Sequence, residues 1–201
     1  MKTIRTIVLF SIAILMVSSC ETVKKVTSKK DKGQKIITTE GGKTGKAISK
    51  FMELQAVELR RVLENASVEA QKQKIRITFE SGVLFAFNSD ELGILSKANL
   101  TNFAEVLINN PDTKLLIEGH TDNKGDLEVN KTISANRASN VAAYLVSKGV
   151  VKKRIKTYGY GSLKPKVDNL SAANRALNRR VEVVIYASEK LVQAAKGGTL
   201  N

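Results

Sequence analysis

The order of apolar and polar positions along the chain predicts a series of strands and helices. Short runs that alternate apolar and polar residues, or that are apolar between polar neighbours, are typical of strands. Such runs occupy 75–80, 115–117, 154–160 and 181–186. Between them, apolar residues recur every three or four positions, which is typical of a helix with one buried side. This spacing occupies 92–108, 126–148 and 171–177.

The predicted fold class follows from this order of elements. Strands and helices alternate in the order β-α-β-α-β-α-β, which implies helices packed on a mixed sheet. The segment 83–87, after the break at Gly82, leads into the first helix. We therefore expect an α+β domain over 75–187.

The longest regular stretch runs from residue 115 to residue 149 and combines a strand, a polar loop and a helix. Asp126 is placed to cap the start of the helix, and Gly149 lies just past its end. Asn130 and Arg137 are seven residues apart, so they face the same side of the helix. The buried stripe is expected to contain Ser134, Ala138, Val141 and Leu145.

The first 20 residues have the features of an export signal. Lys2 and Arg5 give a positive start, and a short apolar run over 7–17 precedes Cys20. A membrane-spanning helix needs about 20 apolar residues, so this run predicts a signal peptide over 1–19. Cys20 is the only cysteine, which excludes an intrachain disulfide.

The region between this signal and residue 75 divides into two parts. Residues 20–46 are polar, and the stretch 24–50 carries nine lysines against two acidic residues. This predicts a solvated tether, with contact to anionic lipid head groups as the alternative. The segment 47–74 is predicted to contain an amphipathic helix that packs on the domain or on a partner. The helical spacing of its apolar residues continues to about residue 70. A homo-oligomer or an envelope protein is the possible partner of 47–70. The tail 188–201 has no clear structural prediction.

The net charge of +14 raises the possibility of a nucleic-acid partner. An export signal argues against that class. An enzyme is not indicated, because no metalloprotease motif and no serine or cysteine catalytic set is visible. His120 is the only histidine, and no cysteine accompanies it, so it is interpreted as a structural residue. Neither a metal nor a cofactor is expected.

Three motifs within 75–187 together resemble the OmpA-like C-terminal domain family, whose members bind peptidoglycan. The first combines the GHTD sequence at 119–122 with Gly125, Asn130, Ser134, Arg137 and Ala138. The second is YGYGSLKP at 158–165, and the third is NRALNRRVEV at 174–183. Upstream, VLFAFNSDEL at 83–92 is similar to the strand that opens the family's domain. Ile133 and Asn174 depart from the family pattern, which usually has Leu and Gly there.

This resemblance implies a binding site for the free amino-acid end of a peptidoglycan stem peptide, such as diaminopimelate. Asp122 would accept hydrogen bonds from the ammonium group, and Arg137 would bind the carboxylate through two parallel hydrogen bonds. The family pattern adds four supporting positions: Thr121, Asn130, Asn88 and Arg175. The alternative for Asp122 and Arg137 is a structural salt bridge that fixes the loop to the helix.

Residues 17–20, Val-Ser-Ser-Cys, resemble the lipobox of bacterial lipoproteins. That resemblance implies that Cys20 is acylated and becomes the first residue of the mature chain. Together the two resemblances imply an outer-membrane lipoprotein that faces the periplasm and tethers the envelope to the cell wall. The related flagellar stator type would require an uncleaved membrane-spanning helix, which the sequence does not predict.

Overall fold

The computed structural model describes residues 30–31, 34–35, 42–86 and 89–200. The predicted signal peptide, Cys20 and Asn88 lie outside these residues. The helices are α1 (Gly42–Val62), α2 (Ser81–Leu84), α3 (Ile94–Asn109), α4 (Leu127–Ser147), the 3-10 turn η1 (Lys152–Arg154), α5 (Ala172–Asn178) and α6 (Glu189–Lys196). The strands are β1 (Lys30–Asp31), β2 (Gln34–Lys35), β3 (Ala66–Gln71), β4 (Lys74–Glu80), β5 (Thr113–His120), β6 (Ile155–Gly159) and β7 (Arg180–Ala187).

Five strands form one mixed sheet in the order β3-β4-β7-β5-β6. β5 and β6 are parallel, whereas β7 runs antiparallel to both of its neighbours, β4 and β5. The last strand of the chain therefore lies in the middle of the sheet. β1 and β2 form a separate antiparallel pair.

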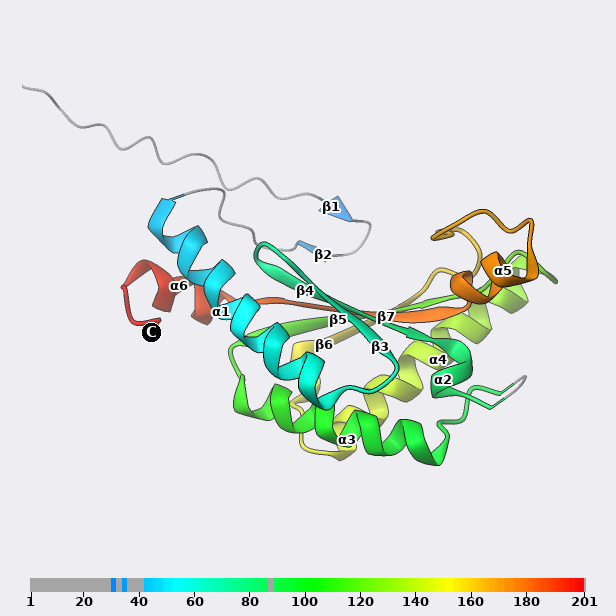
Figure 1. Ribbon diagram of the computed structural model, residues 1–201, viewed down its shortest axis with the longest axis horizontal. Coiled ribbons are helices and arrows are strands. Elements are labelled where there is room, and N and C mark those ends of the chain that lie inside the picture. The colour runs from blue at the N-terminus through cyan, green and yellow to red at the C-terminus, as the bar shows by residue number, and fades with distance from the viewer. Residues whose placement is uncertain (1–29, 32–33, 36–41, 87–88, 201) are drawn as a thin grey trace, which may run out of the picture.

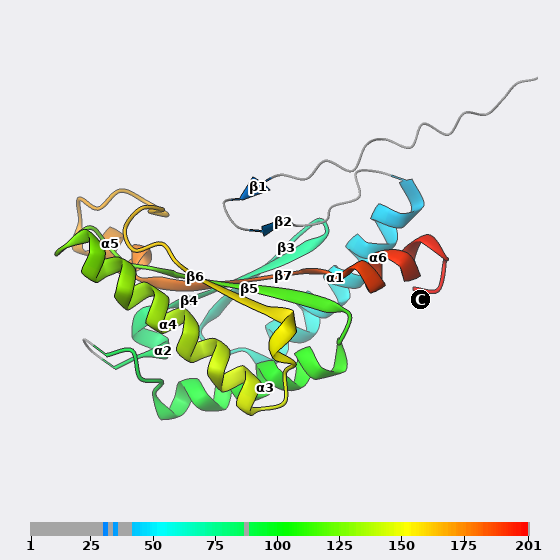
Figure 2. The same ribbon diagram turned by 180° about the vertical axis from the view of Figure 1, so that it is seen from behind.

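Helices α1, α3 and α4 cover one face of this sheet (Figures 1 and 2). Their apolar sides and the inward residues of the strands form a single core, which includes Met52, Phe79, Phe103, Ile117 and Val183. α6 joins the same core through Leu191, Val192 and Ala195. The arrangement of helices on a mixed sheet confirms the predicted α+β class.

The predicted central helix is confirmed together with both of its ends. The Asp126 side chain accepts hydrogen bonds from the backbone N–H groups of Glu128 and Val129, at 2.9 and 3.0 Å. Gly149 has a φ of 102°, a conformation that favours glycine. The buried residues of α4 are Asn130 and the four that the spacing predicts.

The prediction that the helix beginning near residue 47 continues to about residue 70 is wrong at its C-terminal end. α1 ends at Val62, and Ala66–Gln71 forms strand β3 instead. Asn65, with a φ of 53°, leaves the helical conformation between them. β3 alternates half-buried and exposed residues and pairs along its whole length with β4. The alternation over 66–71 is the strand signal, and pairing with β4 decides the conformation.

The opening strand that the family resemblance implies over 83–92 is also not what the described residues form. Ser81–Leu84 is a short helical turn, and Phe85 makes an isolated bridge with Leu92. The N–H of Ser81 donates to the carbonyl of Arg179, so the chain turns where β4 leaves the sheet.

Two glycines let α4 approach the sheet closely. A Cβ on Gly119 in β5 would lie 2.0 Å from the carbonyl oxygen of Ser134. A Cβ on Gly159 in β6 would lie 2.4 Å from the backbone nitrogen of Ala135. This contact brings the N-terminal half of α4 against the ends of β5 and β6. Within the described part of the chain, none of the helices combines the length and apolar character needed to cross a bilayer.

Candidate functional site

A pocket of about 1200 Å³ lies where β5 ends and α4 begins. Its walls come from α2 and the segment after it, from the loop 121–126, from the first half of α4 and from the end of α5. Thr121, Asp122, Asn130 and Arg137 all line it. The structure therefore brings together four of the six binding residues expected from the sequence.

Asp122 is held in place from two sides. One carboxylate oxygen, Oδ1, accepts a hydrogen bond from the backbone N–H of Lys124 at 3.0 Å. The other, Oδ2, forms an ion pair with Arg179, whose Nη1 lies 2.7 Å away. Asp122 is 8% exposed. The carboxylate is thus fixed at the pocket wall with a cation beside it.

Arg137 reaches the same pocket from α4. Its Nε and Nη2 both donate to the backbone carbonyl of Ser89, at 3.2 and 3.0 Å. The guanidinium also lies over the ring of Phe85, 5.2 Å from the ring centroid. Burial lowers the pKa of Arg137, Asp90 opposes this shift, and Arg179 adds to it. Arg137 remains cationic at neutral pH, since a guanidinium does not lose its proton in proteins.

The expected alternative, a salt bridge between Asp122 and Arg137, is not formed among the described residues. Asp122 pairs with Arg179, while Arg137 bonds a carbonyl. No hydrogen bond of Arg137 Nη1 is formed within the described ranges. Asp122 and Arg137 are therefore held separately in the pocket wall, and Arg179 is the cation paired with Asp122.

Thr121 and Asn130 have different surroundings. Asn130 is buried, and its Nδ2 donates to the carbonyl of Lys124 at 2.8 Å, which ties α4 to the loop. Thr121 is 5% exposed, yet its hydroxyl has no hydrogen-bond partner among the residues that the structure describes. Buried hydroxyls are normally paired. The Thr121 hydroxyl is therefore a buried group at the pocket wall without a partner among the described residues, whereas Asn130 shapes the loop.

Arg175 is not among the residues that line the pocket. Its Nη1 donates to the carbonyls of Asn169 and Leu170, both at 3.0 Å. The same loop is held by Asn178, which is fully buried and accepts hydrogen bonds from the N–H groups of Lys166 and Val167. The contacts of Arg175 with the described residues are those of a loop-organising residue.

Arg179 lines the pocket, although it is not among the binding residues predicted from the sequence. The two neighbours separate where β7 begins. Arg179 lines the pocket and pairs with Asp122. Arg180 is buried on the sheet and pairs with Glu182 at 2.7 Å. The doubled arginine just before a predicted strand was the available signal, since consecutive residues point to opposite faces.

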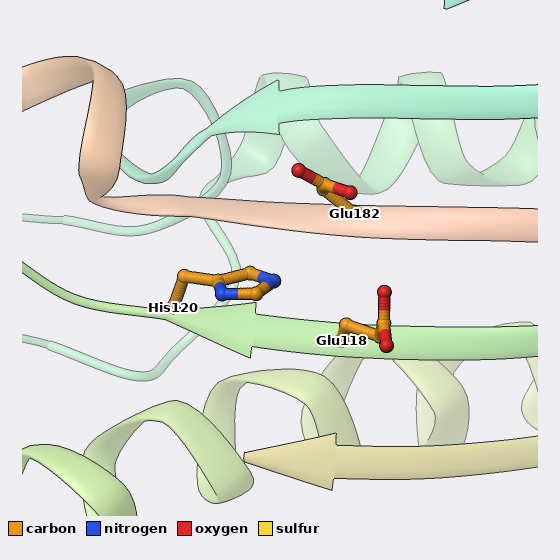
Figure 3. A group of neighbouring side chains, drawn as sticks. All are labelled: Glu118, His120 and Glu182. Carbon is orange, nitrogen blue, oxygen red and sulfur yellow. The ribbon is translucent and has the colours of Figure 1, made fainter. Parts of the chain in front are cut away.

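His120 belongs to a second buried group, on the sheet face away from the helices. Figure 3 shows His120 and Glu118 on β5 and Glu182 on β7, with their side chains turned toward a common space. The three are 2%, 6% and 5% exposed, and their potential ligand atoms lie within 4.8 Å of one another. Glu118 and Glu182 face each other in register across the two strands.

The charges around this group do not suit a divalent metal ion. Glu182 is paired with both Arg76 and Arg180, and Lys164 acts electrostatically on Glu118. Two carboxylates thus already face three cations, which would repel a further double charge. The sequence argument against a metal site considered only histidine and cysteine, and it overlooked the carboxylates that β7 and β5 bring together.

Burial also controls protonation in this group. Burial, with Arg180 next in weight, lowers the pKa of His120 to about 4. Burial raises the pKa of Glu118, and Lys164 opposes that rise. Neither ring nitrogen of His120 has a hydrogen-bond partner among the described residues, although the ring stacks on Tyr160 at 5.5 Å between centroids. His120 is therefore a neutral, packed side chain at pH 7 and not the satisfied histidine that the sequence suggested.

Comparison with known proteins identifies the family. Residues 84–179 match the OmpA family. The outer-membrane lipoprotein YfiB of Pseudomonas aeruginosa is 36% identical over 126 residues, which cover 63% of this chain and 75% of that protein. The chain belongs to the OmpA family. This confirms the resemblance of the three motifs.

Two further relatives extend the comparison. A peptidoglycan-associated lipoprotein of Buchnera aphidicola is 36% identical over 104 residues, 52% of this chain and 60% of that protein. Among solved structures, the cell wall anchor of the T6SS from Pseudomonas aeruginosa superposes with a TM-score of 0.59 at 26% identity. That alignment covers 68% of this chain and 97% of the anchor. The residues that match the OmpA family, 84–179, include Thr121, Asp122, Asn130, Arg137 and Arg179 of the pocket.

Proposed function

We propose that this OmpA-family chain binds peptidoglycan noncovalently and tethers the outer membrane to the cell wall, without catalysis. The observation that carries the proposal is the pocket in which Asp122 lies with the cations Arg137 and Arg179. Its relatives support it, since their names describe an outer-membrane lipoprotein, a peptidoglycan-associated lipoprotein and a cell wall anchor.

The ligand we propose is the free amino-acid end of a stem peptide, with an ammonium and a carboxylate on one carbon, as in diaminopimelate. Asp122 accepts from the ammonium, in exchange for part of its contact with Arg179. Arg137 and Arg179 then take the carboxylate, because a guanidinium forms strong charge-assisted hydrogen bonds with it. The Thr121 hydroxyl supplies one further bond. Asn88 stays a predicted contact, and Arg175 acts on the loop 164–170 and not on the ligand.

The anchor in this proposal is an acylated Cys20. Stable membrane attachment requires more than one acyl chain, and the lipobox-like residues 17–20 predict such a modification. With Cys20→Ala, we expect the mature protein to leave the membrane fraction or to accumulate as an unprocessed precursor. Intact mass spectrometry of the membrane-bound chain measures the modification directly. An unmodified thiol on a mature chain that begins elsewhere would exclude the anchor.

The pocket is tested by binding to purified peptidoglycan. Truncating one partner of a paired charge costs about 2–5 kcal/mol, and about 1.4 kcal/mol corresponds to a factor of ten in affinity. We therefore expect Asp122→Ala and Arg137→Ala each to weaken binding at least about tenfold. Arg137→Lys should also bind poorly, since an ammonium cannot reproduce the planar arrangement of donors.

Matched controls remove charges of the same kind far from the pocket. Asp112→Ala and Arg60→Ala delete partly exposed residues outside the pocket lining. Asp112 forms an ion pair with Lys190, and Arg60 forms one with Glu53 and donates to the carbonyl of Val68, so both variants should bind like the wild type. Circular dichroism and thermal melting establish that each variant is folded. If folded Asp122→Ala and Arg137→Ala proteins bind peptidoglycan as tightly as these controls, the site is assigned wrongly.

A further inference from the structure

The outward side of α1 carries a continuous stripe of basic and apolar residues. The stripe recurs at steps of three and four residues, which places its members on one side of a helix. All six are exposed, with Leu54 and Val57 at 58% and 56%. We call this set the α1 stripe: Lys43, Lys46, Lys50, Leu54, Val57 and Arg61.

The orientation of the α1 stripe is fixed by the opposite side of the helix. That side is buried against α3, α6 and strands β3 and β4. Ile48, Met52, Ala56 and Leu59 are completely buried there. Since these residues hold α1 in place, the stripe cannot turn into the protein. Its four cations and two apolar side chains stay on the surface.

The acidic residues next to the stripe do not neutralise it. Glu53 lies at its edge and forms its ion pair with Arg60, at 3.3 Å, which is not a member of the stripe. Glu58 lies at the other edge and is only half-exposed. No member of the α1 stripe takes part in an ion pair among the described residues. The stripe therefore presents four cations that are not held in ion pairs with the described residues.

The stripe begins at the end of the molecule that lies away from the pocket. In Figures 1 and 2 the first turns of α1 lie beside α6 at one end of the long axis. The elements α2 and α5 and the start of α4, which form the pocket, lie at the other end. Cys20 precedes Gly42 by 22 residues, a length that spans at most about 75 Å. One end of the domain is thus suited to the wall, and the other is within reach of a lipid anchor.

We propose that the α1 stripe lies on the surface of a bilayer that contains anionic phospholipids; this inference rests on the lipid anchor of the proposed function. Lysine and arginine near such a surface are attracted to the phosphate head groups. Leu54 and Val57 lie between the cations, and their apolar side chains enter the boundary between head groups and acyl chains. Binding of a helix at a membrane surface scales with the apolar area buried there plus the electrostatic attraction to anionic lipids, and the α1 stripe supplies both. The first turns of α1 then lie at the membrane, and the pocket lies at the opposite end of the long axis of the molecule.

The first experiment measures whether the α1 stripe lies in the bilayer surface, using the full mature chain with its lipid anchor. The protein contains no tryptophan, so Leu54→Trp introduces a single fluorophore. In vesicles of phosphatidylethanolamine with phosphatidylglycerol, we expect a blue shift of its emission and quenching by brominated acyl chains. Neither should occur in phosphatidylcholine vesicles. Leu170→Trp is the control, since Leu170 is 87% exposed in the loop before α5 and should remain unquenched.

The second experiment measures the charge and does not require the anchor. The mature chain with Cys20→Ser is sedimented with the same phosphatidylglycerol vesicles. Each basic residue at an anionic surface contributes several-fold to binding, so the triple substitution Lys43→Glu, Lys46→Glu and Lys50→Glu should reduce vesicle binding at least about tenfold. A matched triple substitution of the exposed Lys152, Lys153 and Lys156 to Glu should leave it within about twofold.

The outcomes separate this inference from the proposed function. The charge-reversed chain should bind purified peptidoglycan like the wild type, whereas Asp122→Ala should bind vesicles like the wild type. Equal emission of the Leu54→Trp protein in the two kinds of vesicle would overturn the inference. So would loss of peptidoglycan binding in the Lys43, Lys46 and Lys50 variant with unchanged vesicle binding, because the stripe would then serve the wall. Equal vesicle binding by the two triple variants would show that the net charge of the protein, and not the α1 stripe, attracts it to the vesicles. That result would also overturn the inference.

Discussion

The two faces of strands β5 and β7 are stabilised in different ways, although they belong to the same backbone. Toward the helices, the strands present fully buried aliphatic side chains such as Leu115, Ile117 and Ile185. On the opposite face, at the pocket end, the same strands present Glu118 and Glu182, both more than nine-tenths buried. One face gains stability from apolar area removed from water. The other depends on each charge having its partner.

Burial alone therefore does not predict how much a substitution changes the free energy of unfolding. On the apolar face, the cost of a change follows the volume that is lost. On the charged face, it follows whether a group is left without its partner, and removing both members of a pair can cost less than removing one. The following three predictions test this distinction, beginning with the largest effect.

The largest effect is expected from a cavity on the apolar face. Phe79 is completely buried under the helices. Phe79→Ala should lower the free energy of unfolding by about 3–5 kcal/mol, because the lost contacts and the residual cavity both contribute. Urea denaturation followed by circular dichroism measures the change. Leu170→Ala, at an exposed apolar position, should remain within about 0.5 kcal/mol of the wild type.

Removing one charged partner from the opposite face should lower the free energy of unfolding by about 3 kcal/mol. Glu182→Leu leaves Arg180 buried without its carboxylate. Adding Arg180→Met removes that unpaired charge and should restore most of the lost free energy of unfolding. If stability on this face depended only on the volume of the side chains, the second substitution would not restore it. The same denaturation measurement applies to both proteins. A double variant that is less stable than Glu182→Leu would contradict the distinction between the faces.

The smallest effect is the contribution of His120 to the pH dependence of stability, which is complete only at low pH. Its folded pKa of about 4 lies below the ordinary 6.5, so between these values the unfolded chain binds the additional proton. Stability is therefore fully present above pH 6.5 and falls by up to about 3 kcal/mol as the pH falls toward 4.

Glu118 contributes with the opposite sign, because its raised pKa favours proton uptake by the folded protein. The His120 contribution is therefore read as the difference between the wild type and His120→Phe, which keeps an aromatic ring against Tyr160. That difference should grow as the pH falls from 6.5 to 4. Parallel stability curves for the two proteins would mean that His120 is solvated or protonated in the folded state.

Much of the fold could be predicted because its signals are local. The cap at Asp126, the glycine at 149 and the apolar stripe of α4 each depend on residues close in sequence, and the structure confirms them. β3 was interpreted as helix because its six residues, Ala66–Gln71, form a strand only through pairing with β4. A short edge strand has few residues, so its alternation of half-buried and exposed positions is a weaker signal than the helical spacing of the apolar residues before it.

The residues of the pocket were predictable where a family motif covers them, and their pairing was not. Asp122 and Arg137 both reach the pocket, yet Asp122 pairs with Arg179, which is 57 residues away in sequence. Arg154 is a similar case: its guanidinium is buried and donates to carbonyls of Leu107, Asn110 and Thr113. Nothing near Arg154 in the sequence indicates these acceptors. Long-range pairs of charged side chains are decided by the fold and not by the local pattern.

The position of β7 has a consequence for how the protein acquires its structure. β7 separates β4 from β5, so the sheet order cannot be completed until β7 has been delivered. Any process that supplies the chain from its N-terminal side, whether synthesis or transport, delivers β7 after the other four strands of this sheet. Before then, β4 and β5 both have open edges, and the contacts that close the sheet span about a hundred residues, from Lys74 to Tyr186. Such distant contacts slow folding. The arrangement therefore makes completion of the native sheet depend on the arrival of β7.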